Sequence, residues 1–305
     1  MIKEKERERF WLLLMFVAVC TGCTGPEASA PATGPTCIRL ALEQSLFGLE
    51  ESRSTASELN GETIAFAVGS FSGTYREVWE AQVEGSEAMP LPPRYYPEDG
   101  SRLYLRGYYP VAEPGSNGVV YRLDGSQDLL VSNEQSGCLT DMFWQESKKF
   151  TFKHLLTQLN IRIRTGEDYP AAARLTRMQI GGSHPDVLLD LNKGSLLAIG
   201  EPAVLTVWEP GGTGALLSET FPDQPAAMVM LEAGVALTFF ATVSLPDGTN
   251  IAYEALPIRF AEADGLPRAG VSYTLSVTLD TEKEKLTLST TVADWAEKEG
   301  GEVEL

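Results

Sequence analysis

The feature of this sequence that most restricts its fold is a recurring alternation of apolar and polar residues. It is clearest from Tyr273 to Leu279, where every second residue is apolar. The same alternation occurs at residues 38–42, 102–106, 159–164 and 286–289. Successive side chains of a β-strand point to opposite faces, so such strands bury one face and expose the other. The pattern therefore predicts antiparallel sheets.

Turn signals and the scarcity of helical periodicity extend this prediction to the whole chain. Segments that contain Gly with Pro or Asp separate the alternating stretches, at residues 98–100, 113–115, 210–212 and 246–248. Residues 152–158 fit either a helical or a strand period. We expect an all-β protein of two tandem antiparallel β-sandwiches. The polar segment 166–170 is the expected boundary, with the N-terminal sandwich over residues 36–166 and the C-terminal sandwich over residues 167–305.

The first residues carry a different pattern, which is typical of an export signal. The apolar run Phe10–Val19 follows four basic residues. As a helix it would extend about 15 Å, half of a bilayer core. It is too short to span a membrane but suits a signal peptide.

The cysteine at position 23 resembles the modified residue of a bacterial lipoprotein. Gly22 precedes Cys23, whereas bulky Val19 precedes Cys20, so Cys23 is the expected lipidation site. The alternative is a plain secretory signal with an incidental cysteine. We expect residues 1–22 to be a lipoprotein signal peptide and the Pro- and Ala-rich residues 23–35 to be a flexible tether.

Charge and cysteine content restrict the partners and the covalent framework. The chain has a formal net charge of −18, so DNA and RNA would repel it and nucleic acid is excluded as a partner. Beyond Cys23 only Cys37 and Cys138 remain, which is too few for a disulfide framework. One bridge between these two cysteines and two free thiols are the open alternatives.

The sequence shows no recognisable catalytic, metal or cofactor motif. The chain has two histidines, and no Cys/His cluster has zinc-ligand spacing. His154 has apolar neighbours, which favours packing or a backbone hydrogen bond, and His184 lies in a Gly-, Ser- and Pro-containing stretch typical of a loop. The segment Gly69–Gly73 has Phe71 where a nucleophile elbow needs Ser. We therefore expect no enzyme, no cofactor and no metal site.

Two clusters of tyrosine offer a possible binding surface. They are Tyr95 with Tyr96, and Tyr108 with Tyr109. Together they could form a platform on which sugars stack. Packing in cores and turns is the more common use of such aromatic residues.

Four segments together resemble one protein family in their order and spacing. The chain is similar to the fimbrillins, the lipoprotein-precursor pilus subunits of Bacteroides-type bacteria. The segments are Leu103-Tyr-Leu-Arg-Gly-Tyr-Tyr-Pro110, Thr140-Asp-Met-Phe-Trp144, the stretch from Phe150 to Ile163 that includes His154, and Gly270-Val-Ser-Tyr-Thr-Leu275 followed by Val292-Ala-Asp-Trp295.

The resemblance implies both a fold and a route of assembly. It implies two transthyretin-like β-sandwiches and a lipidated precursor that is carried to the outer membrane. An Arg-specific protease then cuts after the first strand, and a terminal strand of another subunit fills the vacated groove. Here the first strand would be residues 37–42, and Arg53 is the cleavage candidate. An ordinary loop arginine is the alternative for Arg53.

The sequence leaves open which segment is the donor strand and which role the chain has within a fimbria. Residues 302–305 alternate but are short for a donor, and they could instead be the last strand of the second sandwich. The expected function is a structural subunit of a cell-surface fimbria, whose partners are the same or related subunits through strand addition, and the outer membrane through the lipid. The alternative is an uncleaved, lipid-anchored surface protein, namely a pilus anchor, a tip adhesin or a glycan binder, whose partner is a host protein or glycan. A Cys37–Cys138 bridge would retain the first strand after a cut at Arg53.

Overall fold

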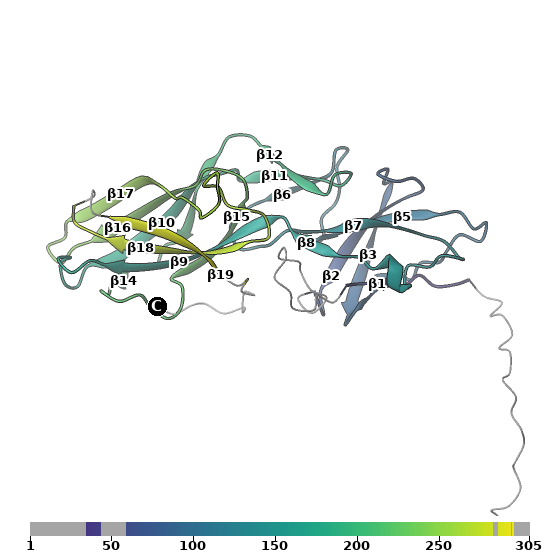
Figure 1. Ribbon diagram of the computed structural model, residues 1–305, viewed down its shortest axis with the longest axis horizontal. Coiled ribbons are helices and arrows are strands. Elements are labelled where there is room, and N and C mark those ends of the chain that lie inside the picture. The colour runs from purple at the N-terminus through teal and green to yellow at the C-terminus, as the bar shows by residue number, and fades with distance from the viewer. Residues whose placement is uncertain (1–34, 44–58, 283–285, 294, 296–305) are drawn as a thin grey trace, which may run out of the picture. The chain divides into compact units, whose positions relative to one another are not determined.

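The computed structural model describes residues 35–43, 59–282, 286–293 and 295. The described strands belong to one compact unit, Thr36–Leu305 (Figure 1). One turn of 3-10 helix, η1 (Glu146–Lys148), accompanies them. The strands are β1 (Leu40–Ala41), β2 (Thr63–Gly69), β3 (Glu77–Glu84), β4 (Glu87–Leu91), β5 (Leu103–Tyr109), β6 (Val119–Arg122), β7 (Leu130–Gly137), β8 (Phe152–His154), β9 (Leu156–Thr165), β10 (Arg174–Ser183), β11 (Asp186–Asp190), β12 (Ser195–Ile199), β13 (Ala203–Trp208), β14 (Ala215–Leu216), β15 (Ala227–Glu232), β16 (Thr238–Ser244), β17 (Asn250–Pro257), β18 (Ser272–Leu279) and β19 (Thr287–Ala293).

The first half of the chain forms a seven-stranded sheet that surrounds its own core. Its strand order is β1-β4-β3-β2-β5-β7-β8, and all its pairs are antiparallel. Alternation places Trp79, Ala81 and Val83 of β3 in a core cluster with Phe66 of β2 and Phe150. The two ends of the sheet meet, because Leu42, next to β1, forms an isolated bridge with Phe150, just before β8.

A small sheet, which the sequence did not reveal, covers the other face of these strands. Its order is β12-β11-β6, so a strand from before residue 166 pairs with one from after it. Its inward residues Val119, Val187 and Leu189 pack with Ala67 and Tyr108 of the large sheet in a separate core cluster. This sheet combines strands from both sides of residues 166–170. The expected domain boundary at these residues stays a prediction.

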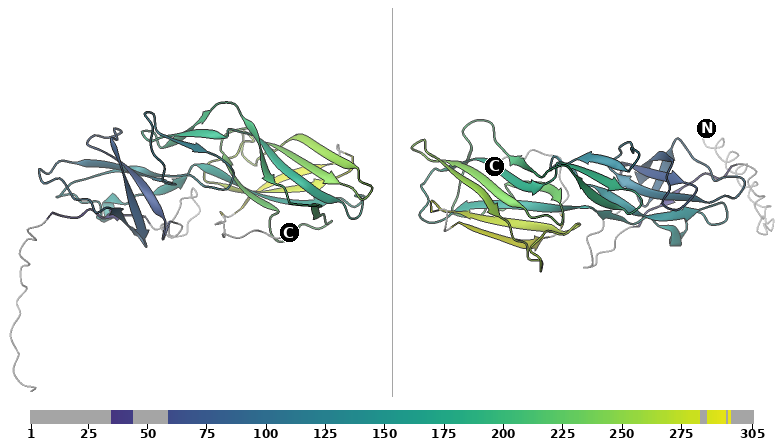
Figure 2. Two further views of the ribbon diagram at one scale, coloured as in Figure 1. Left: turned by 180° about the vertical axis from the view of Figure 1, so that it is seen from behind. Right: turned by 90° about the horizontal axis from the view of Figure 1, so that it is seen from above.

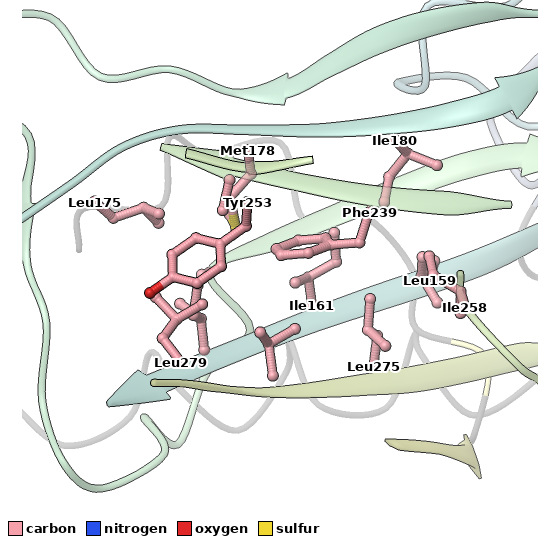
Figure 3. Packing of buried hydrophobic residues seen from close by; sticks show 14 of the residues in the cluster. Leu159, Ile161, Leu175, Met178, Ile180, Phe239, Tyr253, Ile258, Leu275 and Leu279 are labelled. Carbon is pink, nitrogen blue, oxygen red and sulfur yellow. The ribbon is translucent and has the colours of Figure 1, made fainter. Parts of the chain in front are cut away.

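The second half of the chain forms a β-sandwich. A four-stranded sheet, β15-β9-β18-β19, faces a sheet in which β13, β10, β16 and β17 are neighbours and β14 also pairs with β10. Figure 3 shows side chains of β9 and β18 pointing toward those of β10, β16 and β17. The fully buried residues of this core include Leu159, Ile161, Met178, Phe239 and Leu275.

One strand pair contradicts the expectation of purely antiparallel sheets. Strand β9 pairs with β18 in parallel, from Ser272 opposite Gln158 to Leu279 opposite Thr165. In both views of Figure 2 the yellow C-terminal strands lie beside this earlier, teal strand. A parallel pair needs a long connection, and the hundred or so residues between β9 and β18 supply it.

The polar residues Gln158 and Asn160 of β9 are buried, although the alternation predicted a solvent-facing side. Asn160 is only 8% exposed. Its amide donates to the Ser272 hydroxyl at 3.0 Å, and that hydroxyl donates to Gln158 Oε1 at 2.8 Å. These two buried side chains of β9 are therefore hydrogen-bonded through Ser272 of the parallel neighbour.

The all-β fold class is confirmed, and the alternating stretches form strands or lie directly beside them. The segment 152–158, which fitted two periods, forms β8 and the start of β9. The turn signal at residues 246–248 separates β16 from β17, and Thr249 N–H donates to Asp247 at 2.8 Å there. Pattern and turn chemistry together account for the strand assignments.

Glu134 on β7 holds a neighbouring loop in place. Its carboxylate accepts hydrogen bonds from the Ser72 hydroxyl at 2.6 Å, the Gly73 N–H at 2.8 Å and the Tyr75 hydroxyl at 2.5 Å. Burial raises the pKa of Glu134, but these hydrogen bonds and Arg106 outweigh burial, and the pKa lies below its ordinary value. The charged carboxylate thus fixes the loop to the sheet.

We predict that Glu134→Gln lowers the free energy of unfolding by about 1–3 kcal/mol at pH 7, because hydrogen bonds to a charged group are lost. A lowered folded-state pKa stabilises the fold above the unfolded pKa of about 4.3, and this contribution disappears as the pH falls through the folded-state pKa. The difference between the two proteins should therefore shrink below about pH 4. Denaturant unfolding at several pH values measures it, with Glu98→Gln, an exposed turn carboxylate, as the control.

Candidate functional site

The first segment, residues 36–43, is an extended stretch that is hydrogen-bonded along both sides. On one side lie β4 and the residues before and after it. The Ile38 N–H donates to the Arg94 carbonyl at 2.8 Å, and the Leu42 N–H donates to the Ser86 carbonyl at 2.8 Å. Between them, β1 pairs with β4 in antiparallel register. This side is the first wall of the candidate site.

A second wall, residues 141–150, lies on the other side of the first segment. The Ala41 N–H donates to the Phe143 carbonyl at 3.3 Å, and the Glu43 N–H donates to the Phe150 carbonyl at 3.1 Å. In return the Phe150 N–H donates to the Ala41 carbonyl at 2.8 Å. The first segment therefore lies as an inserted strand between two walls that come from distant parts of the sequence.

Three apolar side chains of the first segment complete the core of the seven-stranded sheet. Ile38, Leu40 and Leu42 are 0%, 0% and 1% exposed, and they pack in one cluster with Phe66 and Phe143. Burial of three such side chains stabilises the fold by roughly 5–9 kcal/mol. Loss of the segment would leave an apolar groove flanked by unpaired backbone groups, which is the acceptor that strand addition requires.

The two walls are also tied to each other without the first segment. The Phe143 N–H donates to the Tyr96 hydroxyl oxygen at 2.7 Å, and the two rings stack with centroids 6.0 Å apart. Burial raises the pKa of Tyr96 to about 12, so the phenol stays neutral at physiological pH. This link joins the two walls through side chains that lie outside the first segment.

An ion-pair cluster fixes the second wall to the large sheet. Asp141 accepts from Lys148 Nζ at 2.9 Å and from Nη1 of Arg102, the residue before β5, at 2.6 Å. The hydrogen bonds from Lys148 and Arg102 hold the pKa of the Asp141 carboxyl below its ordinary value. The second wall is therefore positioned by side chains that do not belong to the first segment.

The processing residues expected from the sequence lie outside the described residues. This holds for the signal peptide over 1–22, Cys23, the tether over 23–35 except its last residue, Arg53 and the alternating residues 302–305. The lipidation and cleavage predictions therefore stay predictions.

The two remaining cysteines are free thiols in the structure. The backbone of Cys37, at the start of the first segment, forms an isolated antiparallel β-bridge with that of Tyr95. The Cys138 sulfur lies 3.4 Å from the Thr140 hydroxyl. A comparison of molecular masses with and without reductant tests for a bond between the two cysteines.

Both histidines have carboxylate partners. His154 is buried, its Nδ1 contacts Asp128, and its ring lies 4.0 Å from that of Trp295 between centroids. The packing expectation for His154 is confirmed, with a carboxylate in place of a backbone partner. His184 lies between β10 and β11, where its Nδ1 contacts Glu232 at 2.7 Å.

The platform of four tyrosines is wrong, because two of its members are buried in different places. Tyr96 and Tyr108 are 3% and 0% exposed and belong to different core clusters. The Tyr108 hydroxyl donates to the Ala112 carbonyl at 2.8 Å. Tyr95 is half exposed and Tyr109 is partly exposed.

The described residues lack the features of two other classes of site. They contain no group of three or more His, Cys, Asp or Glu side chains arranged to hold a metal ion. They also contain no helix of the length and hydropathy needed to cross a membrane.

A comparison of the sequence with models of known protein families assigns this chain to a family. The model of the fimbrillin-like family matches residues 72–295 of the 305. The chain belongs to the fimbrillin-like family. This match begins after the first segment and ends at Trp295, the last residue of the resemblance noted in the sequence. No curated protein sequence matches the chain.

Solved structures share the fold at low sequence identity. A proposed cell adhesion protein from Bacteroides uniformis is 18% identical, with a TM-score of 0.55, and the match covers 88% of this chain and 100% of that one. One from Parabacteroides distasonis is 11% identical, with a TM-score of 0.57, over 85% and 96% of the two chains. One from Bacteroides ovatus is 12% identical, with a TM-score of 0.54, over 87% and 99%. These likenesses establish the fold alone.

Proposed function

We propose that this fimbrillin-like protein is a structural subunit of a cell-surface fimbria that assembles by donor-strand exchange. One observation carries the proposal. The first segment is an inserted strand, hydrogen-bonded on both sides, that supplies three buried side chains to the core. A segment of this kind can be replaced by an equivalent strand from another subunit without any other change in the sheet.

The proposed route begins with export as a lipoprotein precursor. Lipid on Cys23 holds the precursor at the outer membrane, and a protease cuts after Arg53. The first segment then leaves, and its groove accepts a strand from the next subunit. Because donor and acceptor are different surfaces, the contacts are head-to-tail and generate an open filament. The role is structural, and the partners are copies of this chain or related fimbrial subunits.

The structure also suits the alternative role of an uncleaved anchor or surface binding protein. With the first segment in place the groove is closed and the core is complete. Such a chain would stay attached through Cys23 and would end a filament instead of extending it. Cleavage at Arg53 separates the two roles.

We predict that Arg53→Ala abolishes incorporation of the protein into filaments, because the first segment would remain in its groove. Filaments sheared from cells and separated on a denaturing gel measure incorporation. Arg39→Ala is the matched control, since Arg39 lies in the segment that is removed and its ion pair with Glu87, at 3.7 Å, is exposed. Normal incorporation of the Arg53→Ala protein would contradict the proposed cleavage site.

A further inference from the structure

The strand β12 has a free edge on the small sheet. Within the described residues it pairs with β11 alone, and the order of the sheet is β12-β11-β6. Figure 1 shows β12 on the outer side of β11, away from β6. A free edge presents unpaired N–H and C=O groups to any strand that can lie beside it.

This edge lacks the usual protection against pairing. Its five residues, Ser195–Ile199, contain no charge and no proline. Leu197 is 45% exposed and Ile199 is 40% exposed. Natural sheets usually protect such edges with charged residues, proline or bulges. A bare, apolar edge in a chain with 22% charged residues therefore points to a partner strand.

An exposed apolar row crosses the sheet and ends at this edge. Leu188 of β11 lies opposite Val120 of β6 on one side and opposite Leu197 of β12 on the other. Val120 is 57% exposed, and Leu188 is partly exposed. A strand added to β12 with an apolar residue opposite Leu197 would continue the row.

The sequence of this strand and its flanks is complementary to itself. The segment is Lys193-Gly-Ser-Leu-Leu-Ala-Ile-Gly-Glu201. In an antiparallel pair of two copies with Leu197 at the centre, the turn that holds Lys193 in each copy lies at the end of the pair where Glu201 of the other copy follows β12. Gly194 lies opposite Gly200, and both glycines have positive φ, which ends the strand at each side. The Lys193 side chain is 69% exposed and forms an ion pair with Asp190 at 3.3 Å, and Glu201 is exposed, so both charges face solvent.

We propose that β12 pairs with β12 of a second copy of this chain about a two-fold axis through Leu197. The pairing joins two small sheets into one of six strands. The row Val120, Leu188 and Leu197 then continues into the same row of the second copy. Two Lys193–Glu201 pairs close the ends of the contact and fix its register.

This contact differs in kind from strand exchange at the first segment. Strand exchange uses two different surfaces and extends a filament, whereas β12 uses the same surface on both copies and closes after two. The β12 pair could therefore connect two filaments side by side. It does not depend on cleavage at Arg53 or on the proposed function.

Cross-linking of the full chain displayed on cells tests the pair. Residues directly opposite in antiparallel strands have Cα atoms about 4.5–5.5 Å apart, within the range that a disulfide spans. Leu197→Cys should therefore give a dimer of twice the 33.2 kDa precursor mass, less any processed residues, after mild oxidation. Val204→Cys, which places a thiol at a 50% exposed position on β13, is the matched control and should give background levels.

Charge reversal tests the register. In the Leu197→Cys background, Lys193→Glu or Glu201→Lys alone should lower the dimer yield about fivefold, because each creates two like-charge contacts. The double reversal should restore the yield. A Leu197→Cys yield no higher than that of Val204→Cys would overturn the proposal, and so would a yield that the single reversals leave unchanged.

Discussion

Removal of residues 1–53 is expected to convert a monomeric chain into a ladder of oligomers. The truncated chain lacks Ile38, Leu40 and Leu42, so the core of its seven-stranded sheet is open to solvent between two walls. An equivalent strand from another copy regains roughly 5–9 kcal/mol of apolar burial in addition to the backbone hydrogen bonds. Mass measurement of the truncated and the intact protein after incubation gives the result directly.

A synthetic peptide provides the matched control for this experiment. A peptide of residues 36–43 should occupy the groove and stop growth of the ladder, because it restores the native strand. The same peptide with Leu40→Asp should have no effect, since it places a charge in the core without a partner. A truncated protein that stays strictly monomeric in the absence of peptide would count against strand exchange.

The substitution Leu40→Ala in the uncleaved chain is expected to lower the free energy of unfolding by about 2–5 kcal/mol. Leu40 is fully buried and sits in the middle of the first segment. Arg39→Ala, at the neighbouring exposed position, should change the free energy of unfolding by less than about 0.5 kcal/mol. Denaturant unfolding of the three proteins measures both effects.

Cleavage should remove the effect of Leu40→Ala entirely. A chain cut after Arg53 no longer contains residue 40, so the parent and variant become the same protein. Equal stability of Leu40→Ala and Arg39→Ala in the uncleaved chain would show that the first segment contributes little to the core, contrary to its burial.

Much of the fold could be predicted from local sequence patterns. The alternation from Tyr273 to Leu279 corresponds to β18, and the turn at residues 246–248 separates two strands as its residues indicate. These predictions succeeded because side-chain alternation and turn geometry are local properties of the chain.

Strand pairing could not be predicted in the same way. Strand β6 has four residues and finds its partner, β11, after more than sixty residues of intervening chain. The parallel contact of β9 with β18 and the burial of Asn160 depend on hydrogen bonds across a still longer separation. The alternation of apolar and polar residues within one strand does not predict which distant strand pairs with it.

The sequence predicted one part of the candidate site, the first strand, but not the second wall. Alternation at residues 38–42 identified the first strand, but nothing local indicated that Phe143 and Phe150 would form its second wall. Tyr96 and Tyr108 were open to two uses from sequence alone, and their burial in different clusters decided for packing. The contact between His154 and Trp295 joins two of the recognised segments, which only the folded chain brings together.

The measurement that most directly tests this account is the N-terminus of the protein recovered from the bacterial surface, determined by mass spectrometry. A protein that starts at Ser54 has lost its lipid anchor and its first segment, as the strand-exchange account predicts. An intact chain that carries lipid on Cys23 would contradict that account and would instead support a permanently anchored surface protein.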